Sequence, residues 1–262
     1  MKIETNEITT NYETSGRSEG DTVVLSHSLG SSLIMWEPQI DEFSKNFQIL
    51  RYDTRGHGNS SAPPSSYTME LLVDDAVALL DALGIEKVHW VGLSMGGMIG
   101  QGLALKSPER LKSLTLCNTM SVIREEMKEV WKNRIKTGER FGMHHLVDFT
   151  MERWFTESYR EMGTEDYQRI RAQFLDTAVY GYVGCCHAIY NLNYVEQLNQ
   201  ISVPTHIIAG DQDLATPVAE SRVMRDQIAG SSLTVIEGAA HLSNVEKTEA
   251  FNASLATFLQ SQ

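Results

Sequence analysis

Short runs of apolar and β-branched residues alternate with amphipathic segments along most of this chain. The clearest helix is predicted from about Thr68 to Leu83, where apolar side chains recur on one face and Gly84 can end it. Further helices are predicted from about Pro217 and about Asn244. Six runs predict buried strands: Thr22–Ser26, Gln48–Tyr52, Lys87–Val91, Leu111–Cys117, Val203–Ala209 and Leu233–Ile236. This alternation indicates an α/β fold, with a mostly parallel central sheet and helices on both faces.

The stretch from 120 to 199 breaks the alternation. Its β-branched runs vanish, and charged, aromatic and methionine residues take their place. We therefore predict a helical cap insertion at 120–199 in a core formed by 1–119 and 200–262, all within one structural domain. Such a cap would lie over the crevice where open α/β sheets bind ligands, which favours a lid. The alternative for any one of its aromatic residues is packing in the insertion's own small core.

Composition narrows the class of protein. A chain of 262 residues that is 42% hydrophobic can bury one substantial core. The net charge of −12 argues against a nucleic-acid partner, because phosphate contacts need clustered Lys and Arg. The first twelve residues lack the apolar stretch of a signal peptide, and no segment approaches the roughly 20 apolar residues that span a bilayer. We expect a cytoplasmic protein without a membrane partner, and the sequence makes no prediction of its oligomeric state.

The three cysteines predict no disulfide framework and no metal site. Their number is odd, and Cys185 and Cys186 are adjacent, a spacing that rarely meets disulfide geometry without strain. With Cys117 they form no Cys-x-x-Cys or Cys/His ligand spacing. We expect buried, inert thiols, and neither a metal nor another cofactor.

The segment Gly92-Leu93-Ser94-Met95-Gly96-Gly97 carries the strongest chemical signal. It follows a predicted strand and precedes an apolar, glycine-rich helix. In that context Gly-x-Ser-x-Gly is typical of the nucleophile elbow of the α/β-hydrolase fold, where the flanking glycines permit a strained turn that exposes the serine. We predict Ser94 as the catalytic nucleophile. The alternative is a serine in an ordinary helix-capping turn.

A serine nucleophile needs a base, and the base needs an orienting acid. On the α/β-hydrolase fold these follow the serine in the order acid, then histidine. We predict Asp213, after the strand that ends at Ala209, and His241, after the strand that ends at Ile236. Asp211 is the alternative acid. His57 is the alternative histidine, but it precedes the nucleophile and is expected to brace a loop.

The developing oxyanion needs two preorganised N–H donors. The residue after the nucleophile supplies one in this fold, which indicates the Met95 amide. The second should come from the loop after the first buried strand, where His27-Ser28-Leu29-Gly30 stands in place of the usual His-Gly-x-Gly. We assign it to the Leu29 amide.

Several stretches together resemble one family, the 3-oxoadipate enol-lactonases of bacterial aromatic degradation. The resemblance spans most of the chain and includes the predicted cap. It implies a serine hydrolase without a cofactor that opens a small lactone bearing a carboxymethyl group. The stretches are Ser28-Leu29-Gly30, Met35-Trp36, 50–58, 80–85, 92–98, 116–119, Arg153-Trp154-Phe155-Thr156, Gly184-Cys185-Cys186 and 240–244.

The anionic substrate implied by the resemblance requires a local cation, since the chain itself is acidic. The family's tract Ala-Ile-Arg-Asp reads Ala188-Ile189-Tyr190-Asn191 here. A tyrosine in place of an anchoring arginine would favour a different or less charged lactone or ester. Arg134 and Arg153 are the candidate anchors, with Lys132 as a further one, and the alternative for each is a solvated surface charge. The predicted substrate-binding residues are Trp131, Arg134, Trp154 and Tyr190.

Three functions are compatible with these residues. The first is hydrolysis of 3-oxoadipate enol-lactone to 3-oxoadipate through an acyl-enzyme on the serine. The second is a carboxylesterase or another lactonase that uses the same triad. The third belongs to another class, a ligand receptor or sensor on the hydrolase fold, which would turn its ligand over very slowly.

Overall fold

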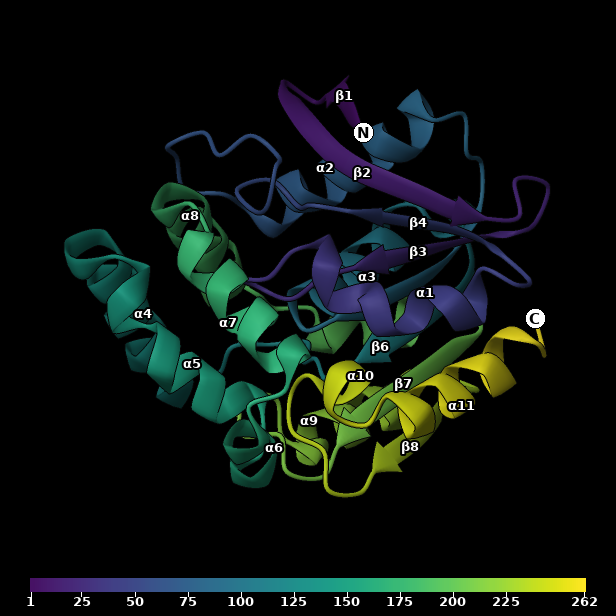
Figure 1. Ribbon diagram of the computed structural model, residues 1–262. Coiled ribbons are helices and arrows are strands. Elements are labelled where there is room, and N and C mark those ends of the chain that lie inside the picture. Colours follow the sequence, from purple (N-terminus) through teal and green to yellow (C-terminus); the bar gives the residue numbers. More distant parts are fainter.

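An eight-stranded sheet forms the centre of the structure, a computed structural model that describes residues 1–262 (Figure 1). The strand order is β1-β2-β4-β3-β5-β6-β7-β8. Strands β3 to β8 run parallel, whereas β1 and β2 are antiparallel to their neighbours. The strands are β1 Lys2–Thr5, β2 Ile8–Gly16, β3 Thr22–Ser26, β4 Gln48–Tyr52, β5 Val88–Leu93, β6 Leu111–Cys117, β7 Thr205–Gly210 and β8 Ser232–Ile236.

All six predicted strands are present, and their ends agree within about two residues of the prediction. The N-terminal pair, β1 and β2, was not predicted. Strand β2 is built largely from Thr, Asn, Glu and Ser, and two thirds of its residues are exposed or only partly buried. A strand near the sheet edge does not need the continuous apolar run of a buried parallel strand, so its sequence signal is weak.

Helices cover both faces of the sheet (Figure 1). Helix α3 packs on β5 and β6 beside α2, and α9 packs on β7 and β8, while α1 lies against α11 on the other face. The predicted helix from Thr68 is α2, and the Thr68 side chain caps it by accepting from Leu71 N–H. The helices outside the cap are α1 Glu37–Phe43, α2 Met69–Ala82, α3 Met95–Lys106, α9 Val218–Gln227, α10 Ser243–Glu246 and α11 Thr248–Leu259.

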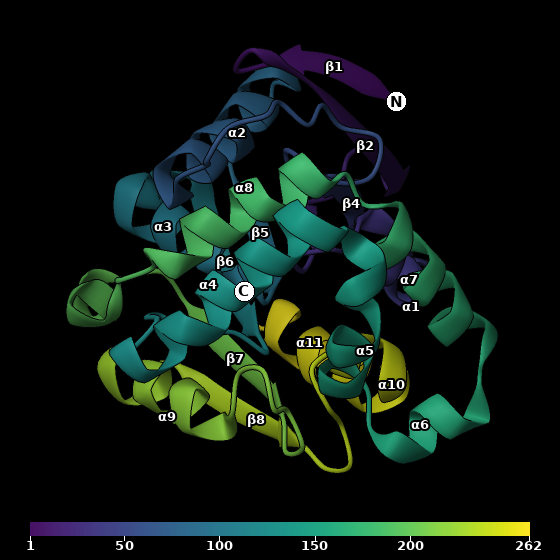
Figure 2. The same ribbon diagram turned by 90° about the vertical axis from the view of Figure 1, so that its left-hand side faces the viewer.

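Five α-helices lie between β6 and β7, in the segment where a helical insertion was predicted. Figure 2 shows α4 and α8 passing in front of the central strands. Two chain segments run antiparallel at the base of this insertion, where Tyr194 N–H donates to Ser121 O at 2.7 Å and Ile123 N–H donates to Leu192 O at 3.0 Å. The division at 120 and 199 and the lid role stay predictions. The helices are α4 Glu125–Phe141, α5 Val147–Trp154, α6 Glu157–Met162, α7 Glu165–Asp176 and α8 Val179–Tyr190.

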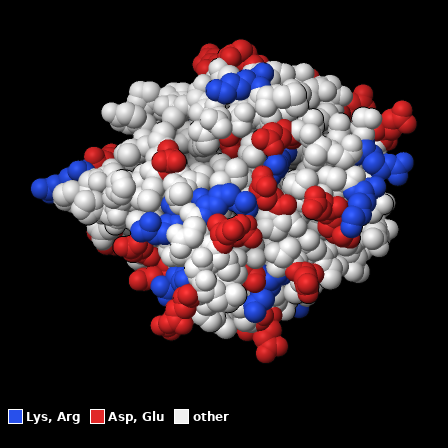
Figure 3. All heavy atoms as spheres, in the orientation of Figure 1, with Lys and Arg blue, Asp and Glu red and all other residues white.

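The surface is charged but mixed. On the face seen in Figure 3, Lys and Arg side chains lie among Asp and Glu side chains. Ion pairs between the two kinds of side chain include those of Arg51 with Glu13 at 2.7 Å and with Glu37 at 3.0 Å. None of the helices is both long and apolar enough to cross a membrane. Short 3₁₀ helices complete the structure: η1 Leu33–Trp36, η2 Pro108–Arg110, η3 Met143–His145 and η4 Val195–Gln200.

Candidate active site

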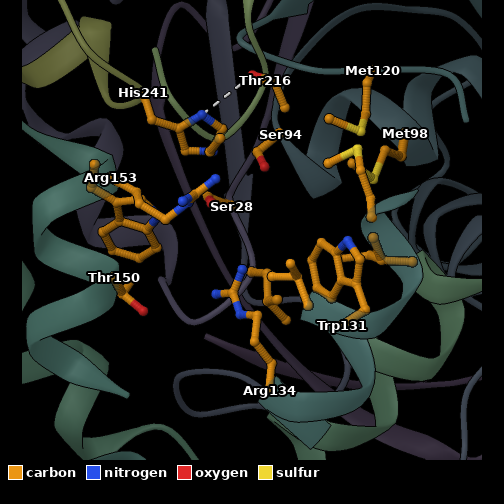
Figure 4. A pocket seen from close by; sticks show the side chains of 16 residues that line it. Ser28, Ser94, Met98, Met120, Trp131, Arg134, Thr150, Arg153, Thr216 and His241 are labelled. Carbon is orange, nitrogen blue, oxygen red and sulfur yellow. Dashed lines mark hydrogen bonds between the residues drawn. The ribbon is translucent and has the colours of Figure 1, made fainter. Parts of the chain in front are cut away.

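Ser94 stands alone between β5 and α3 in a backbone conformation that L-residues rarely adopt. Its φ is +55° and its ψ is −114°. The Ser94 amide donates to Cys117 O at 2.9 Å, and Thr119 Oγ1 donates to Ser94 O at 2.7 Å, so the end of β6 holds the turn. A Cβ on Gly92 would lie 2.1 Å from Gly96 O, and a Cβ on Gly96 would lie 2.1 Å from Ser26 O, which explains both glycines of the motif. The strained turn directs the Ser94 hydroxyl into a pocket at the carboxyl edge of the sheet (Figure 4).

His241 and Asp213 meet in the loops after β8 and β7. The distance from His241 Nδ1 to Asp213 Oδ2 is 2.8 Å, and both side chains are buried. Thr216 Oγ1 donates to Asp213 Oδ2 at 2.6 Å, and the amides of Ala215 and Thr216 donate to Oδ1 at 2.7 and 2.9 Å. Burial works to raise the pKa of Asp213, but His241 and the Thr216 hydrogen bonds outweigh burial and hold that pKa below its usual value. The carboxylate therefore stays ionised beside the imidazole.

The two alternative residues occupy other positions. Asp211 Oδ1 accepts from Gly238 N–H at 2.8 Å and from Ala239 N–H at 3.3 Å, so it braces the loop before the histidine without reaching the ring. His57 Nε2 accepts from Gly30 N–H at 2.8 Å, the loop-bracing position that its sequence context suggested. The geometry therefore favours Asp213 and His241.

Ser94 and His241 face the same pocket (Figure 4). No hydrogen bond joins Ser94 Oγ to the imidazole in this structure, although both side chains line one cavity. In hydrolases such hydrogen bonds are often long without substrate and tighten in the complex. The arrangement can therefore support transfer of the serine proton to His241 Nε2, because Asp213 fixes the proton of the ring on Nδ1.

The two amides predicted to bind the oxyanion have no acceptor within the protein. The Leu29 N–H donates to no other group of the protein. The Met95 N–H lies at the first position of α3, where helical amides have no acceptor within the helix. Met95 directly follows Ser94, and Leu29 lines the same pocket as Ser94. The two amides therefore remain available for a developing negative charge.

Two buried histidines hold the loop that carries Leu29. His27 Nδ1 donates to Ser28 O at 2.8 Å, and His27 Nε2 accepts from Thr54 N–H at 2.9 Å. Each ring therefore needs one unprotonated nitrogen as an acceptor. Nε2 of His27 accepts from the Thr54 amide, and Nε2 of His57 accepts from the Gly30 amide. Burial lowers the pKa of His27 to about 4; burial and the nearby His27 lower the pKa of His57 to about 3. The sequence indicated a brace at His57, but nothing in its local pattern indicated which amide the ring contacts.

The pocket is lined by apolar side chains from the core and the cap together with two arginines. Trp131 and Trp154, two of the residues predicted to bind substrate, are among the lining residues. Arg134 from α4 and Arg153 from α5 also line it, and Figure 4 shows their guanidinium groups directed toward the space in front of Ser94. No Asp or Glu belongs to the lining. The pocket thus offers two positive charges without a carboxylate to neutralise them.

The contacts of these arginines are to neutral groups. Arg134 Nε donates to Tyr182 Oη at 3.0 Å, and its guanidinium lies 4.8 Å from the centre of the Trp131 ring. Arg153 donates to Leu214 O at 2.6 Å and lies 5.1 Å from the centre of the Phe149 ring. Burial and the neighbouring Arg134 lower the pKa of Arg153, and Asp213 offsets only part of this. An anionic group bound between the two guanidinium groups would relieve their repulsion.

The structure places Tyr190 outside this pocket, contrary to the sequence-based expectation. Its neighbour Ile189 lines the cavity, whereas the Tyr190 ring lies 5.4 Å from Nζ of Lys128 on α4. Successive residues of a helix point about 100° apart, so Ile189 can face the cavity while Tyr190 is directed toward Lys128. Lys132 pairs loosely with Glu129 at 3.9 Å and does not line the pocket.

No group of three or more His, Cys, Asp or Glu residues is arranged to hold a metal ion. The three cysteines are free and buried. Burial raises the pKa of Cys186 to about 12, so its thiol stays protonated at neutral pH.

A serine in a strained turn after a strand, with aspartate and histidine in later loops, is the arrangement of one large class of enzymes. The chain belongs to the alpha/beta hydrolase fold family, whose profile matches residues 21–248. Two curated relatives are 3-oxoadipate enol-lactonases 2 and 1 of Acinetobacter baylyi, 35% and 34% identical, each alignment covering 97% of this chain and 94% of the relative. A solved structure described as the enol-lactonase from Burkholderia xenovorans LB400 has a TM-score of 0.96 and 38% identity, covering 99% of this chain and 100% of that chain.

These comparisons confirm the predicted fold and the predicted resemblance to the 3-oxoadipate enol-lactonases. They also confirm the prediction that the chain is an enzyme of the hydrolase class. The similarity extends through the cap, because the alignments cover nearly the whole chain.

Proposed function

We propose that this protein hydrolyses a small enol-lactone that carries a carboxylate, with 3-oxoadipate enol-lactone as the substrate. The observation that carries the proposal is the pair of guanidinium groups in front of Ser94, which lack any carboxylate partner in the pocket lining. The similarity to enol-lactonases supports the same substrate class. The tyrosine at position 190, where the family has an arginine, does not argue against an anionic substrate, because Tyr190 does not line the pocket.

Ser94 attacks the lactone carbonyl in the proposed mechanism, and His241 takes its proton while Asp213 orients the ring. The Leu29 and Met95 amides stabilise the oxyanion. Collapse breaks the ring C–O bond and expels an enolate, which receives the proton from His241 and tautomerises to the ketone. Water activated by His241 then hydrolyses the ester on Ser94. This step restores the serine hydroxyl and releases the product with its second carboxylate.

The arginines determine the substrate class in this proposal. A carboxymethyl group between Arg134 and Arg153 accepts charge-assisted hydrogen bonds, and the lactone carbonyl then points at Ser94. Arg153 also contacts Leu214 O in the loop that follows Asp213, so it can keep this contact through one nitrogen and offer another to the substrate.

The substrate class is tested with two lactones that differ in one group. Wild-type enzyme is assayed on the enol-lactone and on the same ring with a methyl in place of the carboxymethyl group, by loss of the enol-lactone absorbance. We expect kcat/KM to be at least tenfold higher for the carboxylate-bearing lactone. Equal or higher kcat/KM for the methyl lactone would reject the anionic substrate and favour a general esterase or another lactonase. Negligible turnover of both lactones and of simple esters, with ligand binding retained, would favour a receptor.

A further inference from the structure

We infer that Asn118, which the proposed reaction does not use directly, is a positioning residue. It fixes the position of the acid Asp213 relative to the base His241. This inference rests on the proposed roles of Asp213 and His241. Asn118 does not line the pocket, so it can act on the reaction only through these two residues.

Asn118 occupies a junction at the end of β6. Its neighbours hold the nucleophile, since Cys117 O accepts from the Ser94 amide and Thr119 Oγ1 donates to Ser94 O. Its own amide donates to Ile208 O at 2.7 Å. Asn118 is fully buried with a φ of +43°, in the left-handed region that costs energy for a residue with a side chain. A buried residue in such a conformation persists only where its surroundings impose it, and here it directs the side chain at the two catalytic loops.

The Asn118 side chain links both loops. Nδ2 donates to Asp213 Oδ2 at 3.0 Å and to Ala240 O at 3.3 Å, next to His241. Oδ1 accepts from Ser243 Oγ at 2.6 Å. A carboxylate and a carbonyl can only accept, so the amide nitrogen must face them, and the Ser243 hydroxyl fixes the oxygen on the other side. One side chain thereby sets the spacing of the acid loop and the histidine loop.

An amide is required at this position for an electrostatic reason. Asp213 Oδ2 already accepts from His241 Nδ1 and Thr216 Oγ1. The charged or titratable groups around Asp213 are His241, from the loop after β8, and Arg153, from α5. A second carboxylate in contact with Asp213 would share a proton with it, because two buried like charges in contact cannot both ionise. Protonated Asp213 would be a poor acceptor for the imidazole and would no longer hold its tautomer.

Asn118→Asp tests this inference with a nearly isosteric change that also tolerates a positive φ. On any ester or lactone that the wild type hydrolyses, we expect kcat at pH 7 to fall by about 10²–10⁴-fold, the general contribution of a positioned acid–base pair. KM should change by less than about threefold, and the acid limb of the kcat profile should move to higher pH. The far-downfield proton NMR signal of His241 Nδ1–H should weaken or move upfield, a readout that needs no substrate.

Asn6→Asp is the matched control. Asn6 also has a positive φ, +45°, and its Nδ2 donates to the Asp75 carboxylate at 2.6 Å, but it lies in the β1–β2 turn. We expect Asn6→Asp to keep the wild-type kcat and pH profile. Ser243→Ala is a milder second variant, which leaves Asn118 in place but removes the hydroxyl that orients it. It should lower kcat by about 3–10-fold at constant KM, in line with one net hydrogen bond.

A folded Asn118→Asp with wild-type kcat, acid limb and NMR signal would overturn the inference. If that variant fails to fold, Ser243→Ala decides, and an unchanged kcat would overturn it. Failure of the proposed function gives different results. A wrong substrate class would appear as equal or higher kcat/KM for the methyl lactone, and a wrong nucleophile would appear as turnover retained by Ser94→Ala, whatever the behaviour of Asn118.

Discussion

At the scale of single residues, replacing the predicted acid tests the distinction between two nearby aspartates. Asp213→Asn should lower kcat by about 10⁴-fold, because the amide can donate to Nδ1 and so favours the wrong tautomer of His241. Asp211→Asn should stay within about threefold of the wild type, since Asp211 contacts only the amides of Gly238 and Ala239. Steady-state kinetics of both variants at pH 7 measure this difference. The reverse order of effects would assign the acid to Asp211.

The candidate site contains side chains with a local sequence signal and side chains without one. Ser94 could be proposed from the sequence because glycine spacing, strand and helix occur together there. Asp213 and His241 could be proposed from their order and their loops. Asn118 had no such signal, because its proposed role arises from loops that lie about 95 and 122 residues away along the chain. Tyr190 was misassigned because a helical residue's direction depends on how the helix packs.

The arginines predict a substrate-dependent effect. Arg134→Gln and Arg153→Gln should each lower kcat/KM by about 10–100-fold on the carboxylate-bearing lactone, the loss of a charge-assisted hydrogen bond. On the methyl lactone the change should be below about threefold. Arg140→Gln is the control, because Arg140 lies on α4 with Arg134 but is exposed and outside the pocket. Equal losses on both lactones would show that the arginines support the pocket rather than bind the carboxylate.

At the scale of the elements, the parallel strands were the most predictable part of the structure. Strands β3, β5 and β7 are buried along their whole length, and the mostly apolar runs of such strands mark them in the sequence. The β1–β2 pair lacks such runs, and the order of the cap helices depends on contacts that no local pattern encodes. One such contact is between Gly181 of α8 and Gly56 of the core, two backbones that approach too closely for any side chain.

Gly181→Ala should therefore weaken the docking of the cap. The added Cβ would lie 2.0 Å from Gly56 O, so backbone must move, and overpacking of this kind costs about 1–3 kcal/mol. This loss exceeds the gain of roughly 1 kcal/mol that alanine brings to a helix interior. The atom nearest to a Cβ on Gly138 in α4 would be Val183 Cγ2 at 3.1 Å, which is a side-chain atom rather than backbone. Gly138→Ala should therefore change the free energy of unfolding by less than about 1 kcal/mol. Denaturant unfolding of both variants measures the comparison; equal stability would mean that α8 is free to shift.

At the scale of the whole molecule, buried neutral histidines make the fold sensitive to acid. Burial lowers the pKa of His27 to about 4, of His57 to about 3 and of His206 to about 4. In the unfolded chain each titrates near about 6.5. Between these values the unfolded state binds more protons, so stability is fully present above about pH 6.5 and is lost as pH falls toward 4.

Each of these histidines should contribute up to about 1.4 kcal/mol per pH unit to the slope of stability against pH in this range. His206→Gln, far from the pocket, should reduce that slope by the contribution of about one bound proton. His144→Gln on the exposed surface of the cap serves as control. Urea unfolding at half-unit steps from pH 7 to 4.5 gives the slopes. An unchanged slope in His206→Gln would mean that this ring is protonated in the folded state.

The central claim is that Ser94 is the nucleophile for an enol-lactone, and hydrolysis of the freshly prepared lactone tests it most directly. Wild type, Ser94→Ala and Ser221→Ala are compared by loss of the enol-lactone absorbance; Ser221 is a buried serine outside the pocket. The account predicts fast turnover by wild type and Ser221→Ala and a loss of at least about 10⁴-fold in Ser94→Ala. Turnover by Ser94→Ala at the wild-type rate would contradict it.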